Sequence, residues 1–332
     1  MNNHLFRFLI TLLFPAITAF AEDWKIKTDF SDARLLDMNF NSMRIGTAEY
    51  EAGPTGCTVF YFPKGAQCAV DQRGGFSGTY MMGDGYLDAI CYAGGSLLGV
   101  EASAGVAKGL FEKRKSYSWY DIPVVRGAII YDFLPRANLI YPDVTLGKTA
   151  LENAAPNKFY MGRHGAGRHA SVGVGFDPQY AQWGGQGGAF KQVGNTKIAV
   201  FIVCNALGAV HGRDGKVVAG NRDRKTGATF TIAEDVEARI ESGKKLTTSS
   251  GRTTLLLIVT NQKLDHRELR SLARQVNAAM GRVIQPLAAF DDGDVTYAVT
   301  TNEVSNDRIG VTALGVMASE LAWDAALSIF QK

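Results

Sequence analysis

The sequence has few of the features that mark a metal centre, a nucleic-acid surface or a conventional hydrolase. Only five histidines and four cysteines occur in 332 residues, and none of their spacings matches a zinc site. The 35 basic residues exceed the 32 acidic ones by only three, too few to indicate nucleic acid or a membrane surface as a partner. The G-x-S-x-G motif of serine hydrolases is absent. The G-x-G-x-x-A run at 165–170 lacks the strand and helix that a dinucleotide loop needs. We therefore expect no metal, no cofactor and no nucleic-acid partner.

Long apolar runs are also missing, except at the start of the chain. There, one positive charge at Arg7 precedes an apolar stretch over 8–17, and Ala19-Phe20-Ala21 fits a small-x-small cleavage site. This pattern predicts a signal peptide at 1–21 and a mature protein that is periplasmic or secreted. The stretch is too short for a permanent membrane span, and we expect no span elsewhere in the mature chain. Without Arg7, the net charge becomes 34 minus 32, or +2.

The four cysteines would be free to form disulfides in an exported protein. Cys57 and Cys68 flank "TVFYFPKGAQ", which suggests a hairpin with a Pro-Lys-Gly turn. Such a hairpin could place the two thiols opposite each other, although the register of a hairpin cannot be read from its sequence. Cys91 and Cys204 are expected to be buried thiols.

Strand and helix patterns alternate along the chain, as is typical of an α/β fold. Strands are predicted at 58–62, 124–131, 197–204, 253–260 and 295–300, and helices at 89–113, 265–280 and 311–330. Asp265 and Glu268 form the capping-box pattern of a helix start. The strand from Thr253 to Val259 is apolar nearly throughout, which predicts a sheet that is covered on both faces.

The segment 231–251 reads as a connector that leads directly into this buried strand, because it is first charged and then rich in hydroxyls ("ESGKKLTTSSG"). If the bond between Arg252 and Thr253 were cut, Thr253 would carry both a hydroxyl and a free α-amine with a pKa of about 7.7 to 8. The amine could then act as the base for its own hydroxyl. A threonine at the start of a strand is also an ordinary strand former, so the residues alone leave both interpretations open.

A family resemblance covers nearly all of the predicted mature chain. It rests on these stretches, which occur in the family's order: "EYEAGPTGCTVFYFPKGAQCAVDQRGG", "AICYAGGSLLGVEASAGV", "AIIYDF", "YPDVTLGKTALE", "GQGGAF", "RTTLLLIVTN", "IQPLAAFDDGDVTYAVTT" and "TALGVMASELAWDAAL". The sequence resembles the self-cleaving amidases of the β-aminopeptidase and D-aminopeptidase/esterase group, and within it most closely the nylon-oligomer (6-aminohexanoate-oligomer) endohydrolases. The resemblance implies a four-layer αββα sandwich, an α chain of 22–252, a β chain of 253–332, and a homo-oligomer, a tetramer of αβ units.

The resemblance also implies roles for individual residues. "RTT" places the N-terminal nucleophile at Thr253, with autocleavage between Arg252 and Thr253, and "CNALG" supplies Asn205 to stabilise the oxyanion. "DDGD" supplies Asp292 and Asp294 to orient the nucleophile and its amine, although such a run also suits a turn before a strand. "IIYDF" supplies Tyr131 to line the substrate site, and a buried structural tyrosine would look the same in sequence.

Two positions depart from the family pattern. Arg252 stands where relatives have asparagine before the nucleophile, and Val174 or Gly175 stands where the nylon hydrolases carry an active-site lysine. We expect self-cleavage to be slower or differently controlled, and one positive charge to be missing from the site.

The predicted function is therefore an exported, autoproteolytically processed amide hydrolase with an N-terminal threonine nucleophile. Its substrates would be linear amides with unhindered carbons, such as 6-aminohexanoate oligomers or β-peptides. Two alternatives remain from the sequence. One is an aminopeptidase of the same family, acting on β-peptidyl or D-/L-amino-terminal residues. The other is an unprocessed, non-catalytic exported homologue, which the two departures would favour.

Overall fold

The computed structural model describes residues 24–134, 136–247 and 251–331, so the predicted signal peptide lies outside the described residues. The main strands are β2 (Arg44–Tyr50), β3 (Thr55–Gln72), β5 (Gly85–Ala93), β6 (Val125–Ile129), β10 (Gly185–Val193), β11 (Thr196–Asn205), β14 (Thr253–Gln262) and β16 (Val295–Val304). The helices are α1 (Glu101–Arg114), α2 (Val144–Glu152), α3 (Ile232–Glu241), α4 (His266–Met280) and α5 (Val311–Ser328). Short strands complete the fold: β1 (Ile26–Lys27), β4 (Thr79–Tyr80), β7 (Ala155–Pro156), β8 (Ser171–Val172), β9 (Gln182–Trp183), β12 (Ala209–His211), β13 (Val217–Ala219) and β15 (Ile284–Gln285).

One long strand, β3, joins the two halves of the β-structure. The hydrogen-bonded strand order is β10-β11-β14-β16-β3-β5-β6-β4. The first half of β3 pairs with β2, while its second half pairs with β16. The chain therefore bends from one sheet layer into the other within this strand, and the strands form one continuous hydrogen-bonded network.

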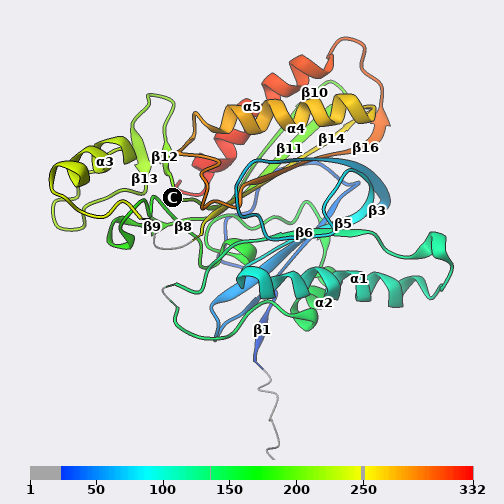
Figure 1. Ribbon diagram of the computed structural model, residues 1–332. Helices are drawn as coiled ribbons and strands as arrows, with labels where there is room; N and C mark the ends of the chain where they lie inside the picture. Colours follow the sequence, from blue (N-terminus) through cyan, green and yellow to red (C-terminus); the bar gives the residue numbers. More distant parts are fainter. Residues whose placement is uncertain (1–23, 135, 248–250, 332) are drawn as a thin grey trace, which may run out of the picture.

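Three separate hydrophobic cores lie between four layers. The central core contains Phe60, Tyr92, Phe201 and Tyr297 and lies between the two sheet layers. A second core packs β11, β14 and β16 against α4 and α5, and a third packs β2, β3 and β5 against α1 and α2. The two helix pairs lie on opposite sides of the β-structure (Figure 1). The predicted αββα sandwich is confirmed.

Both faces of the apolar strand β14 are buried against hydrophobic cores. Leu255, Leu257 and Val259 face the central core, whereas Leu256 and Ile258 face the helices α4 and α5. Side chains alternate between the faces of a strand, so an apolar residue at every position fits a sheet that is buried on both sides. This prediction is also confirmed.

The capping box predicted for α4 is present. The side chain of Asp265 accepts a hydrogen bond from the Glu268 amide, and Glu268 accepts one from the Asp265 amide. The helix then packs its apolar face, which includes Leu269, Leu272 and Val276, against the sheet.

The helix predicted over 89–113 is wrong in its first part. Residues Gly85–Ala93 form β5, and a turn at Gly95, which has φ of +81°, separates this strand from the helix. In "AICYA", Ile90 and Tyr92 enter the central core, while the alternate residues enter the core beside α1. Pairing with β3 and β6 therefore overrides the helix-forming tendency of the alanines.

The predicted hairpin between Cys57 and Cys68 is wrong as well. Both residues lie on the single strand β3, so they cannot face each other across a turn. All four cysteines are free and buried. Cys57 lies beside Cys91 on the neighbouring strand, and a hydrogen bond with Cys91 together with burial raises the pKa of the Cys57 thiol.

The connector predicted over 231–251 is helical in its first half, and its residues 248–250 lie outside the described residues. Its first half is α3, which begins with a capping box formed by Thr231 and Glu234. The cap explains why a polar stretch becomes helical, because it satisfies amide groups at the helix start. In the described part of the chain, no helix is long and apolar enough to cross a membrane.

Gly105 allows α1 to lie directly on α2. A substitution at this glycine therefore tests the packing of the two helices. A Cβ at Gly105 would overlap the backbone oxygen of Val144, whereas one at Gly109 would contact only side chains of α2. We expect Gly105→Ala to lower the free energy of unfolding by about 1–3 kcal/mol, and Gly109→Ala in the same helix to be nearly neutral. Urea denaturation measures both variants, and equal effects would contradict this packing.

Candidate active site

The site lies where β14 begins, between the end of β11 and the turn before β16. Thr253, the first residue of β14, is paired with Asn205, the last residue of β11. On the other side, the backbone of Arg252 pairs with the backbone of Asp292 in an isolated parallel β-bridge. Because β14 and β16 are parallel, the segments that precede the two strands lie side by side. The fold thus brings Thr253, Asn205, Asp292 and Asp294 together.

The carbonyl of Arg252 is the centre of this geometry. The hydroxyl of Thr253 donates to the Arg252 oxygen at 2.6 Å, and the backbone amide of Gly293 donates to the same oxygen at 2.6 Å. Two donors on one carbonyl polarise it, and the threonine hydroxyl is next to the carbon that it would attack.

Gly293 is a functional position that the sequence reasoning missed. A Cβ at this residue would come within 2.6 Å of the Thr253 hydroxyl oxygen, so only glycine lets the backbone approach this hydroxyl so closely. The signal was present as the glycine inside "DDGD", but the residue acts through its backbone amide rather than a side chain.

The side-chain amide of Asn205 is held by two backbone groups. Its oxygen accepts a hydrogen bond from the Ser171 amide at 3.0 Å, and its nitrogen donates to the Tyr131 carbonyl at 3.1 Å. The amide nitrogen carries two hydrogens, and the second makes no hydrogen bond with the described residues. Asn205 can therefore donate to a negative oxygen next to Thr253.

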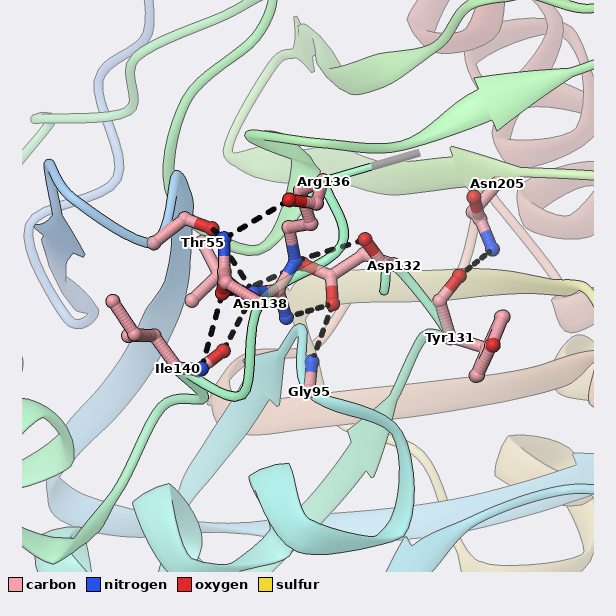
Figure 2. A network of polar contacts seen from close by, with 9 residues as sticks. Thr55, Gly95, Tyr131, Asp132, Arg136, Asn138, Ile140 and Asn205 are labelled. Atoms are coloured by element: carbon pink, nitrogen blue, oxygen red, sulfur yellow. Dashed lines mark hydrogen bonds and ion pairs between the residues drawn. The ribbon is translucent and has the colours of Figure 1, made fainter. Parts of the chain in front are cut away.

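A buried network holds the Tyr131 segment in place (Figure 2). The guanidinium of Arg136 donates to the side chain of Asp132 at 2.8 Å and to its carbonyl at 2.9 Å. Thr55 and the Gly95 amide donate to the remaining sites of the Asp132 carboxylate. Because Asp132 follows Tyr131 directly, this network fixes the carbonyl that orients Asn205. Sequence reasoning did not find Asp132 or Arg136.

The two acidic residues have different environments. Asp294 accepts hydrogen bonds from the amides of Thr254 at 2.5 Å and Ala288 at 2.7 Å, so it anchors the start of β14. Asp292 is only 1% exposed, and its carboxylate lies against the backbone amide of Leu207, which favours the ionised form. Burial, together with the charge of Asp294, raises the pKa of Asp292 to about 8, although Arg252 acts in the opposite direction. Asp292 therefore changes its charge close to neutral pH.

Arg252 is a buried cation beside these groups. Its side chain donates to the Ser171 hydroxyl at 3.2 Å, and burial lowers its pKa to about 10, against the opposing effects of Asp292 and Tyr131. Tyr131 lies beside the site as well, because its carbonyl accepts the hydrogen bond from Asn205. In the uncut chain, Arg252 thus supplies a positive charge near Asp292.

A cavity of about 630 Å³ opens next to the bond between Arg252 and Thr253. Its walls come from four segments far apart in the sequence, and the lining residues are Leu134, Ser171, Pro178, Ala181, Gln182, Trp183, Arg222, Arg224, Gly227 and Arg252. This volume is typical of a small-molecule site.

Comparison with known proteins assigns the chain to a family. The profile of peptidase family S58 matches residues 39–331. The chain belongs to peptidase family S58. It is 41% identical to a 6-aminohexanoate-oligomer endohydrolase of Paenarthrobacter ureafaciens, over 88% of this chain and 85% of that protein.

Solved structures of family S58-like enzymes share the fold. A β-aminopeptidase of a Burkholderia species has a TM-score of 0.57 and 15% identity, covering 92% of this chain and 89% of that one. The L-aminopeptidase D-Ala-esterase/amidase of Ochrobactrum anthropi, a variant of the Ntn hydrolase fold, has a TM-score of 0.58 and 15% identity, covering 91% and 88%. Together with the family match, the relatives identify this S58 protein as a hydrolase of amide or peptide bonds.

The raised pKa of Asp292 predicts a pH-dependent stability. Between its ordinary pKa of 3.8 and about 8, the folded state holds a proton that the unfolded chain has lost, so this group's contribution to stability falls as the pH rises through that window. The substitution Asp292→Asn is made in the Thr253→Ala chain, which stays uncut. We expect the free energy of unfolding of this double variant, compared with that of Thr253→Ala alone, to increase by a few kcal/mol as pH rises from 5 to 9. Denaturation at each pH measures the difference. Asp307→Asn, at an exposed position, is the control, and an equal response in both variants would refute the assignment.

The network around Arg136 predicts an effect on catalysis through Asn205. Arg136→Lys keeps the charge but cannot reproduce the planar set of hydrogen bonds, so the Tyr131 carbonyl and the Asn205 amide should shift. We expect kcat for amide hydrolysis to fall roughly tenfold or more, while KM changes little. Arg114→Lys, in the ion pair with Asp88, is the matched control. A loss of folded protein with unchanged kcat per folded molecule would mean a purely structural role.

Proposed function

We propose that this S58 protein is an exported amide hydrolase that cuts itself between Arg252 and Thr253. The cut gives chains of 22–252 and 253–332 and makes Thr253 the N-terminal nucleophile. The observation that carries the proposal is the convergence of the Thr253 hydroxyl and the Gly293 amide on the Arg252 carbonyl. The apolar run and cleavage pattern at 1–21 support export to the periplasm or out of the cell.

Self-cleavage follows from the groups around this carbonyl. The Thr253 oxygen attacks the Arg252 carbonyl carbon, and the ionised form of Asp292 takes the hydroxyl proton. The Gly293 amide and the second N–H of Asn205 stabilise the negative oxygen that develops. The carbon–nitrogen bond then breaks, the nitrogen gains a proton, and an ester links Arg252 to the Thr253 oxygen. Water hydrolyses the ester, which leaves a carboxylate on Arg252 and a free hydroxyl and amine on Thr253.

The same residues then act on substrate. The α-amine of Thr253 takes the proton from its hydroxyl as the oxygen attacks the substrate amide. Asn205 and the Gly293 amide again stabilise the negative oxygen. The amine passes the proton to the leaving nitrogen, and water releases the acyl group from Thr253. Asp294 keeps the strand start fixed during both steps through its bond to the Thr254 amide.

The substrates that we propose are linear amides, such as 6-aminohexanoate oligomers or β-peptides. The 41% identity to a 6-aminohexanoate-oligomer endohydrolase supports this class, and a cavity of about 630 Å³ can hold several methylene units. An aminopeptidase activity of the same family is the alternative that substrate screening with free and blocked amino ends would reveal.

Intact mass of the purified protein tests the cleavage site. We expect two chains in the wild type, the smaller beginning at Thr253, and a single uncut chain in Thr253→Ala. Gly293→Ala should slow the cut at least tenfold, because its Cβ crowds the nucleophile and displaces the amide donor. Gly310→Ala, where a Cβ meets open space, should cut normally. A single uncut wild-type chain, or a cut that persists in Thr253→Ala, would refute this proposal.

A further inference from the structure

The cavity beside Thr253 has an uneven charge. Three of its lining residues are arginines, Arg222, Arg224 and Arg252, and none is an aspartate or a glutamate. Arg252 is buried and precedes the bond proposed for self-cleavage, whereas Arg222 and Arg224 are exposed. The exposed side of the cavity therefore carries two positive charges that do not depend on Arg252.

The two rim arginines lack the partners that arginines elsewhere on this surface have. Arg213 pairs with Glu320 and Asp324, and Arg270 pairs with Asp84. In the described part of the chain, no carboxylate forms an ion pair with Arg222 or Arg224.

The carboxylate closest to them in sequence is already engaged. Asp223 lies between the two arginines, but its side chain accepts the backbone amides of Lys225 at 2.7 Å and Thr226 at 3.1 Å. These bonds fix the turn, lower the pKa of Asp223 and keep it ionised. The carboxylate thus shapes the turn rather than forming an ion pair with either arginine.

The wall of the cavity is apolar and rigid. Trp183 is 44% exposed. The guanidinium of Arg163 lies 3.8 Å from the centre of its ring, and the ring of His169 lies 4.9 Å away, edge to face. These contacts and the pairing of Trp183 with Ser171 hold the indole in place. Leu134, Pro178 and Ala181 add further apolar surface, which suits a chain of methylene groups.

We propose that this cavity is the subsite for a substrate's terminal carboxylate. The methylene chain of a linear amide lies along Trp183 and Leu134, and the carboxylate at its end binds Arg222 and Arg224. The arginine fork matches the geometry of a carboxylate. This inference rests on the proposed function, because the cavity serves catalysis only if Thr253 is the nucleophile. It defines the substrate class as linear amides that end in a free carboxylate.

Paired substrates test the subsite during turnover. The 6-aminohexanoate trimer has a free carboxylate, and its C-terminal carboxamide has the same chain without the charge. We expect the double variant Arg222→Gln/Arg224→Gln to raise KM roughly tenfold for the acid and to leave the carboxamide unchanged. Arg308→Gln, an exposed arginine beyond the opposite end of β16, is the matched control. Equal effects of the double variant on both substrates, or no effect on either, would overturn the subsite.

A binding measurement separates this inference from the proposed function. Hexanoate and hexanamide are titrated into the wild type while tryptophan fluorescence is followed, and binding of hexanoate but not of hexanamide, lost in the double variant, supports the subsite. If this pattern appears while no amide is hydrolysed, the subsite stands and the proposed function fails. If amides are hydrolysed but hexanoate and hexanamide behave alike, the function stands and the subsite is refuted.

Discussion

The parallel pairing of β14 with β16 is the constraint on which the rest of the site depends. Parallel strands begin at the same edge of a sheet, so the residues before Val295 must lie beside those before Leu255. This pairing brings the Gly293 amide onto the Arg252 carbonyl and lets Asp294 hold the Thr254 amide. The antiparallel pairing with β11 then places Asn205 on the other side of Thr253. The positions of the proposed nucleophile, the amide donor and the carboxylate anchor are thus consequences of one sheet topology, and the cores on both faces of β14 keep it rigid.

In the uncut chain, the buried charges at the site lower the stability of the folded state. Such a loss of stability fits the proposal that the chain is cut at this site. Arg252 and Asp292 are both buried, yet they attract each other without a direct ion pair among the described contacts. Burying charged groups without full pairing is unfavourable, and here it moves both pKa values toward neutrality. Cutting the chain would release Arg252 and introduce the α-amine of Thr253 near Asp292. A new amine would then stand near Asp292 in place of the buried guanidinium.

The features that the sequence could predict are those that depend on residues close together in the sequence or on recognisable motifs. The strand at Thr253, the capped helix at Asp265 and the αββα layers followed from local patterns and from the family resemblance. The dual role of β3 did not, because only pairing with distant strands decides that a Pro-Lys-Gly stretch continues as a strand. In the site, Thr253, Asn205, Asp292 and Asp294 could be named because their side chains stand in motifs. The Gly293 amide and the network of Asp132 with Arg136 could not, because one acts through the backbone and the other through contacts across the fold.

The most direct test of the central claim, that the N-terminal Thr253 is the nucleophile, is to capture its acyl ester. The processed protein is mixed with the 6-aminohexanoate trimer, quenched in acid within the first turnover, and analysed by peptide mass mapping. This account predicts an added acyl mass on the 253–332 chain, located on Thr253. Steady hydrolysis with no acyl group on this chain, or with the group on another residue, would contradict it.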